Sequence, residues 1–272
     1  MYLQRTPAAP LSAHVACLWA SERGALAHAR ERILPNGCDN VVIAMHDAPL
    51  RRFADETATL SQPVGMALWQ GAHDVAVLRD TSAPASVIGI SFRAGGAAAF
   101  AGLPMGGLAG SAVALDALWG PTARDLRERL QHAPGAAARL ALLERWLLKR
   151  LERAAPADPV VQQALTLFAR EPALAQVERV RRATGCSPQR FIARFRDAVG
   201  LTPKRYARVL RFHTLVQQLG ADRATSLAEL ALDAGYADQA HLAHEFRRLG
   251  GLTPGAYRPV AADRPTHVAI GD

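Results

Sequence analysis

Cysteine and histidine are the residues of this 272-residue chain that could carry metal or redox chemistry. Cys17, Cys38 and Cys186 are odd in number and form no Cys-x-x-Cys pair, so neither a disulfide framework nor a thiolate zinc site is indicated. Cys38 stands in a predicted turn, "LPNGCDN", where a thiol could sense oxidants or alkylating agents. Asp39 would raise the pKa of that thiol unless Arg32 lies close enough to offset it. Sensing, plain packing and the lining of a ligand pocket remain three alternatives for Cys38.

The nine histidines do not make a convincing catalytic or metal site. His241 and His244 form a His-x-x-His pair with no third ligand nearby in the sequence. Four others fall among predicted strands without any His-x-His pair, namely His14, His28, His46 and His73. Gly-x-Ser-x-Gly, phosphate-binding and dinucleotide motifs are all missing. We therefore expect no enzyme, no bound metal and no cofactor.

Positive charge is concentrated near the C-terminus. The formal net charge is +8, and residues 159–258 hold 15 Lys or Arg against 8 Asp or Glu. A localised basic domain attracts a polyanion such as nucleic acid, because binding releases condensed counterions. The sequence has no run of about 18 apolar residues and no signal-peptide pattern at its start, so we expect a cytoplasmic protein without a membrane partner.

Periodicity divides the chain into two regions. Up to about residue 110, short apolar runs separated by turn residues predict the strands of a compact sheet or barrel; they are "NVVIAM", "GMALWQG", "DVAVLR" and "SVIGISF". Residues 116–153 are helical in pattern, and "AAPADP" at 154–159 reads as a linker. The fold class we expect is α+β, with a barrel-like N-terminal domain followed by helices and an all-α C-terminal domain.

Leucines form one stripe of the second predicted helix before the linker. Leu140, Leu143, Leu147 and Leu151 recur at helical spacing. This stripe would either pack on the sheet of its own chain or form a dimer seam.

A repeated segment organises the C-terminal hundred residues. "GLTPKRYARV" at 200–209 returns as "GLTPGAYRPV" at 251–260, 51 residues later. In each copy Gly ends a helix, Thr caps the next one and Pro occupies its first position. Before each copy stand two short amphipathic helices around a Gly-containing turn, which is the pattern of a helix-turn-helix unit. In the second unit, Ser226 and Glu229 form a capping box and Asp238 caps the second helix.

The segment "GYADQAHLAHEFRRLGGLTPGAYR" resembles the signature of AraC/XylS-type transcription regulators. The resemblance covers residues 159–259 and implies two helix-turn-helix units joined by a long helix, "TPKRYARVLRFHTLVQQLG", which holds two recognition helices in successive major grooves. Further upstream, "ERILPNGCDNVVI", "GISFRAGGAAAF" and "LDALWG" resemble the uncharacterised domain that precedes this module in one branch of the family.

Helical geometry assigns the residues that would contact DNA. We expect Phe191 and Phe195 to be buried in the first recognition helix, and Leu242 and Phe246 in the second. The opposite faces then present the candidate base-reading residues, which are Gln189, Arg190, Ala193, Arg194, Gln239, Ala240, His241, Ala243 and His244. The candidate phosphate contacts are Lys204, Arg208, Arg211 and Arg247.

These expectations combine into a sequence-specific DNA-binding transcription regulator. Residues 1–153 would sense a signal or dimerise, 154–159 would link, 160–259 would bind DNA and 260–272 would form a tail. The candidate partners are double-stranded DNA, RNA polymerase, a small-molecule effector and a second copy of the chain. The alternatives are a regulator triggered through Cys38, a nucleoid-type binder without an effector, and an enzyme fused to a DNA-binding module.

Overall fold

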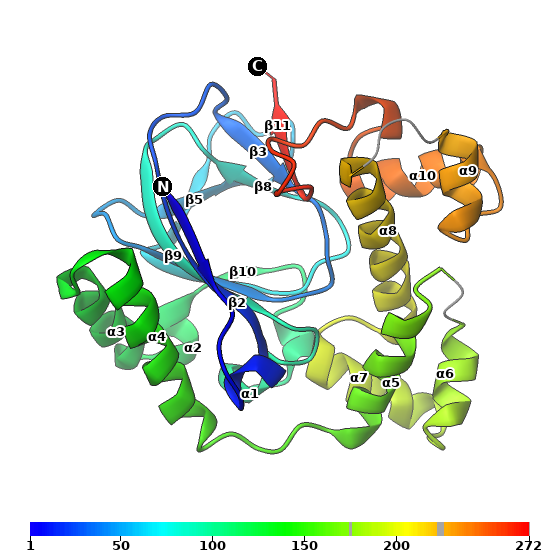
Figure 1. Ribbon diagram of the computed structural model, residues 1–272, viewed down its shortest axis with the longest axis horizontal. Helices are drawn as coiled ribbons and strands as arrows, with labels where there is room; N and C mark the ends of the chain where they lie inside the picture. The colour runs from blue at the N-terminus through cyan, green and yellow to red at the C-terminus, as the bar shows by residue number, and fades with distance from the viewer. Residues whose placement is uncertain (174–175, 222–225, 272) are drawn as a thin grey trace.

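The computed structural model describes residues 1–173, 176–221 and 226–271 (Figure 1). Two antiparallel sheets are built almost entirely from the N-terminal half, and the C-terminal half is helical, which confirms the α+β class. None of the helices in these residues combines the length and the apolar character needed to cross a membrane.

Two sheets form the N-terminal domain. The first has the strand order β1-β2-β9-β4-β7-β10, made of Tyr2–Arg5, Val15–Arg23, Ala85–Phe92, Asn40–Ala44, Ala67–Gln70 and Ala112–Ala114. The second has the order β11-β3-β8-β5-β6, made of His267–Ile270, Arg30–Ile33, Val77–Asp80, Leu50–Phe53 and Gln62–Gly65. The four predicted strands correspond to β4, β7, β8 and β9. The seven other strands were not predicted, β2 among them.

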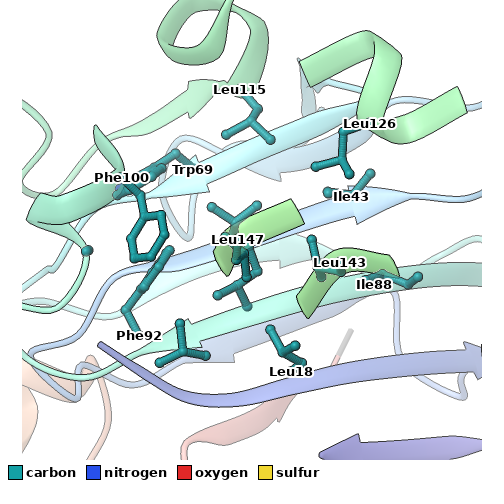
Figure 2. Close-up of a cluster of buried hydrophobic side chains, with 14 of the residues drawn as sticks. Leu18, Ile43, Trp69, Ile88, Phe92, Phe100, Leu115, Leu126, Leu143 and Leu147 are labelled. Atoms are coloured by element: carbon teal, nitrogen blue, oxygen red, sulfur yellow. The ribbon is translucent and has the colours of Figure 1, made fainter. Parts of the chain in front are cut away.

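Helices cover one face of the first sheet. These elements are η1 (Leu11–Ala13), α1 (Ala98–Ala101), η2 (Met105–Gly107), α2 (Leu115–Trp119), α3 (Pro121–His132) and α4 (Gly135–Leu151). Leu143 and Leu147 of α4 are fully buried against Leu18 and Ile88 of the sheet (Figure 2). The leucine stripe therefore packs on its own sheet, where each buried leucine contributes about 1.5 to 3 kcal/mol of hydrophobic stabilisation.

The C-terminal helices form two cores that share one long helix. Their bounds are α5 (Pro159–Arg170), α6 (Val177–Ala183), α7 (Pro188–Val199), α8 (Pro203–Ala221), α9 (Leu227–Asp233), α10 (Gln239–Gly250) and η3 (Pro254–Ala256). One core surrounds Phe195 and the other surrounds Phe246. Tyr206 of α8 belongs to the first core and Phe212 of α8 to the second. The repeated Gly-Leu-Thr-Pro corner is present in both copies, with positive φ at Gly200 and Gly251.

The last residues of the chain are not a free tail. β11 pairs antiparallel with β3, with His267 opposite Ile33 and Ile270 opposite Arg30, so the C-terminus joins the N-terminal sheet. The sequence did not predict this because "HVAI" is short and its pairing partner lies more than 200 residues away. The helical C-terminal half is thus attached to the N-terminal domain through both of its ends.

A carboxyl group is buried beneath the first sheet. Asp39 accepts hydrogen bonds from Trp69 Nε1 (3.0 Å) and from the backbone amide of Ala72 (3.3 Å), both neutral donors. Burial disfavours the charged form and raises the pKa of Asp39 to about 7, although both hydrogen bonds act in the opposite direction.

This shift gives a signed pH dependence of stability. The carboxyl has a pKa of 3.8 when unfolded, so the stability it confers is complete below that pH and declines as the pH rises towards 7. The Asp39→Asn variant keeps an oxygen acceptor and loses the titration. Its free energy of unfolding relative to wild type, measured by urea denaturation, should increase by about 3 kcal/mol between pH 4 and pH 7. Parallel pH profiles for the two proteins would contradict a raised pKa.

Candidate nucleic-acid interface

The first helix-turn-helix unit consists of α6, a turn at Gly185 and α7. Phe191 and Phe195 are buried, as expected, and Phe195 packs against Phe168 of α5 and Tyr206 of α8. Because these aromatic side chains fix which side of α7 faces inward, the opposite side is open to solvent.

Three of the four candidate base-reading residues on α7 lie on that open side. Gln189, Arg190 and Ala193 are exposed. Arg194 is instead paired, with its Nε and a terminal guanidinium nitrogen each 2.6 Å from an oxygen of Asp158. Asp158 is also the N-cap of α5, so Arg194 fastens α7 to α5, and base reading by Arg194 stays a prediction.

Sequence reasoning missed one residue of this face. Ile192 is 46% exposed although it is a large apolar residue. It stands between Phe191 and Ala193, and helical periodicity alone would have placed it outside the core. If α7 entered a major groove, this exposed isoleucine would be suited to contact a thymine methyl group.

The second unit is built by α9, a turn at Gly235 and α10. The capping box of Ser226 and Glu229 is formed, and the Asp238 side chain accepts from the amide of His241 at 2.7 Å. Leu242 and Phe246 are fully buried, as expected.

The exposed side of α10 carries nearly all of the base-reading residues predicted for this helix. Gln239, Ala240, His241 and His244 are exposed, and Ala243 is half-buried. The ring of His241 meets Tyr236 edge-on at 5.3 Å, and its Nδ1 accepts from the amide of Ala237. In the neutral ring the proton is therefore on Nε2, which is left free to donate outward.

Two of the four candidate phosphate contacts have other partners. Arg208 binds Glu245 of α10, with its Nε 3.0 Å from Oε2. Arg211 donates to the carbonyl of Gly235 at 3.2 Å and lies over the ring of Tyr236 at 5.6 Å. Both arginines thus join α8 to the second unit, and contact of either one with phosphate stays a prediction. Their spacing on α8 gave no sign of these contacts, because the partners come from α10 and from the turn before it.

Lys204 and Arg247 remain exposed at the ends of their helices. Both occupy positions from which a cation could meet a DNA backbone.

The long helix α8 also contacts the N-terminal domain. A Cβ atom at Gly37 would lie 3.1 Å from the Tyr206 ring, so the backbone of this turn approaches the helix closely. Arg205 pairs with Asp74 at 2.8 Å, and the amide of Ala76 donates to the carbonyl of Leu249 at 2.7 Å. The two helix-turn-helix units are therefore held against the sheets.

Cys38 lies at this junction, but not as an activated thiol. Burial, and after it the neighbouring Asp39, raise the pKa of Cys38 to about 12. Since the thiolate is the reactive form, this raised pKa lowers the reactivity of Cys38, and sensing by this thiol stays a prediction.

The histidines expected among the strands do not gather. Across residues 1–173, 176–221 and 226–271, no three His, Cys, Asp or Glu side chains come together in a group that could hold a metal ion.

Two domain families match the chain. Residues 180–259 match a helix-turn-helix domain (HTH_18), and residues 3–114 match a domain of unknown function (DUF6597). A protein of Streptomyces antibioticus, provisionally named an AraC-like transcription regulator, is 34% identical over 134 residues, which are 49% of this chain and 40% of that protein. A protein of Streptomyces lividans with the same name is 35% identical over 162 residues, or 52% of this chain and 50% of that protein. The chain thus spans half or less of the length of these relatives.

Among solved structures, ToxT from Vibrio cholerae aligns with 94% of this chain and 97% of its own, at 8% identity and a TM-score of 0.46. The domain matches and the Streptomyces relatives agree with the geometry of the two units. Residues 180–259 of the chain therefore belong to the AraC-type helix-turn-helix family, and residues 3–114 before them to the DUF6597 family.

Proposed function

We propose that the chain is a sequence-specific DNA-binding transcription regulator. The observation that carries this proposal is the pairing of two helix-turn-helix units on one helix, each with its aromatic side buried and its polar side exposed. Such a pair matches the arrangement in which two recognition helices enter successive major grooves on one side of a duplex.

In this proposal the exposed sides of α7 and α10 read bases. Gln189 and Gln239 have the amide geometry that pairs with adenine, and Arg190 has the guanidinium that pairs with guanine. The outward Nε2–H of His241 is a donor for a purine acceptor. Ala193 and Ala240 are small enough to let a base edge approach. Lys204 and Arg247 contact phosphates and set the register.

Selection of bound sequences from random DNA tests this proposal. A discrete consensus of about 20 base pairs, containing two separated blocks of preferred bases, would support it. Recovery of unrelated sequences with equal affinity would instead indicate a nucleoid-type binder.

Gln239→Ala should change specificity. We expect loss of discrimination at one base pair, by about 1 to 3 kcal/mol in a competition binding assay, with non-specific affinity unchanged. Gln217→Ala, which removes an exposed glutamine from α8, is the matched control and should leave the preference intact. If Gln239→Ala weakened all sequences alike, α10 would not be oriented as proposed.

Arg211→Met should lower the stability of the protein, whereas Arg247→Met should weaken its binding to DNA. Arg211→Met removes a hydrogen bond and a cation–π contact, so the free energy of unfolding should fall by about 1 to 3 kcal/mol. Arg247→Met should leave stability unchanged, weaken binding to all sequences and reduce the slope of log affinity against log salt by about 1. If Arg211→Met instead left stability unchanged and reduced the salt dependence of DNA binding, Arg211 would be a phosphate contact.

A further inference from the structure

Both predicted recognition helices end against the N-terminal domain. The C-cap of α7 is Gly200, where a Cβ atom would lie 3.3 Å from the carbonyl oxygen of Met105. Ala72 of the N-terminal domain is also buried in the core of the first unit. The C-cap of α10 is Gly251, where a Cβ atom would lie 2.7 Å from a carboxylate oxygen of Glu56. The two Gly-Leu-Thr-Pro corners are therefore contact points with the N-terminal domain as well as turns between helices.

One loop of the N-terminal domain, residues 71–76 between β7 and β8, joins the two helices α8 and α10. Asp74 pairs with Arg205 in the first turn of α8 at 2.8 Å. The amide of Ala76 donates to the carbonyl of Leu249 in the last turn of α10 at 2.7 Å. The position of α10 relative to α8 is thus held by the N-terminal domain in addition to the core between the two helices.

This loop is itself firmly fixed in the N-terminal domain. The amide of Ala72 donates to Asp39 at 3.3 Å, and the carbonyl of Ala72 accepts from the amide of Gly110 at 2.9 Å. His73 is buried, and its Nδ1 donates to the carbonyl of Val75 at 2.8 Å. Burial lowers the pKa of His73 to about 4, so the ring stays neutral at physiological pH. The loop is therefore a rigid part of the domain that carries it.

The segment after α10 adds another attachment. Tyr257 packs against Phe246 in the core of the second unit, and its hydroxyl donates to the carbonyl of Pro265 at 2.6 Å. The amide of Leu34 donates to the carbonyl of Thr266 at 2.8 Å, and β11 then pairs with β3. The second unit is thus connected to the sheets from both sides of its core.

All of these contacts lie away from the predicted base-reading residues. Ala193 precedes Gly200 by seven positions, and His244 precedes Gly251 by seven positions, which is about 10 Å along each helix. Both Ala193 and His244 are exposed. Helix-turn-helix proteins present the N-terminal residues of the recognition helix to the bases. The docked N-terminal domain therefore holds each helix at its C-terminal end and leaves its N-terminal half exposed.

A body attached to both units restricts how they can move. Long helices bend, and a bend in α8 would turn α10 relative to α7. The N-terminal domain opposes such a bend because it contacts the ends of both helices. A binding surface that is already held in its bound arrangement loses less conformational entropy on binding, which raises affinity.

We propose that the N-terminal domain is a clamp on the two helix-turn-helix units, and that the docked arrangement is the form that binds DNA tightly. A signal that loosened the clamp would weaken binding to the operator. This inference rests on the proposed function and goes beyond it, because it assigns the docked state to the active form.

Asp74→Lys tests the clamp, because it places a second cation against Arg205. Fluorescence anisotropy of the full chain should show an affinity for the selected DNA site that is lower by about 5- to 150-fold, the usual range of coupling between two sites. Electrostatic attraction alone acts in the opposite direction, since the exchange adds positive charge and strengthens binding to a polyanion. Equal or higher affinity for the selected site in Asp74→Lys would overturn the proposal.

Asp125→Lys is the matched control. Asp125 is exposed on α3, which lies on the far side of the sheets from α8 (Figure 1), so the same change of charge should not lower the affinity. Glu56→Lys is a second variant at the other corner, where Glu56 pairs with Arg32 at 2.7 Å from an exposed loop. It should weaken binding to the selected site as Asp74→Lys does, and wild-type affinity in both variants would exclude the clamp.

Hydrogen exchange of the full chain without DNA tests the contact by itself. The amide of Ala76 should exchange faster in Asp74→Lys than in the wild type or in Asp125→Lys, because its hydrogen-bond acceptor lies on α10. Unchanged exchange at Ala76 would overturn the clamp whether or not the chain binds DNA. A wild-type chain that selected no DNA site would contradict the proposed function itself, whereas site selection with undiminished affinity in Asp74→Lys would contradict only the clamp.

Discussion

The helix α8 is the element on which the arrangement of the molecule depends. Its first turns bury Tyr206 and Val209 in the core of the first helix-turn-helix unit, and its later turns bury Phe212 and Val216 in the core of the second. The 19 residues of α8 span about 28 Å at 1.5 Å per residue. Because both cores are built on the same helix, the two units cannot change their separation without bending α8 or breaking a core. The exposed sides of α7 and α10 thus inherit a fixed spacing.

The same helix connects the two helix-turn-helix units to the sheets of the N-terminal domain. Tyr206 packs under the turn at Gly37, Arg205 pairs with Asp74, and the chain then returns through β11 to pair with β3. The C-terminal half is therefore attached at its start, along α8 and at its end. Glu31 lies where the last of these attachments meets the second sheet, since it binds both Arg79 of β8 and His267 of β11.

Much of this architecture could be predicted from the sequence, because local chemistry determines it. Gly235 in the turn, Ser226 with Glu229 in the capping box, and the spacing of Leu242 and Phe246 sufficed to place the second unit and its exposed side. Local patterns could not reveal contacts between distant segments. Arg208, Arg211 and Arg194 resembled free cations in the sequence, yet each has a partner that only the folded chain brings within reach. β11 escaped prediction for the same reason, since its partner β3 lies in a distant segment of the chain.

Hydroxyl-radical footprinting of the full chain on its selected DNA site addresses the central claim most directly, because it reports the spacing of the two units in solution. Two recognition helices fixed on α8 should protect two short stretches separated by one helical turn, about 10 base pairs, on one side of the duplex. A single protected stretch, or two stretches whose separation varies from site to site, would contradict a pair of units held at one spacing by a shared helix.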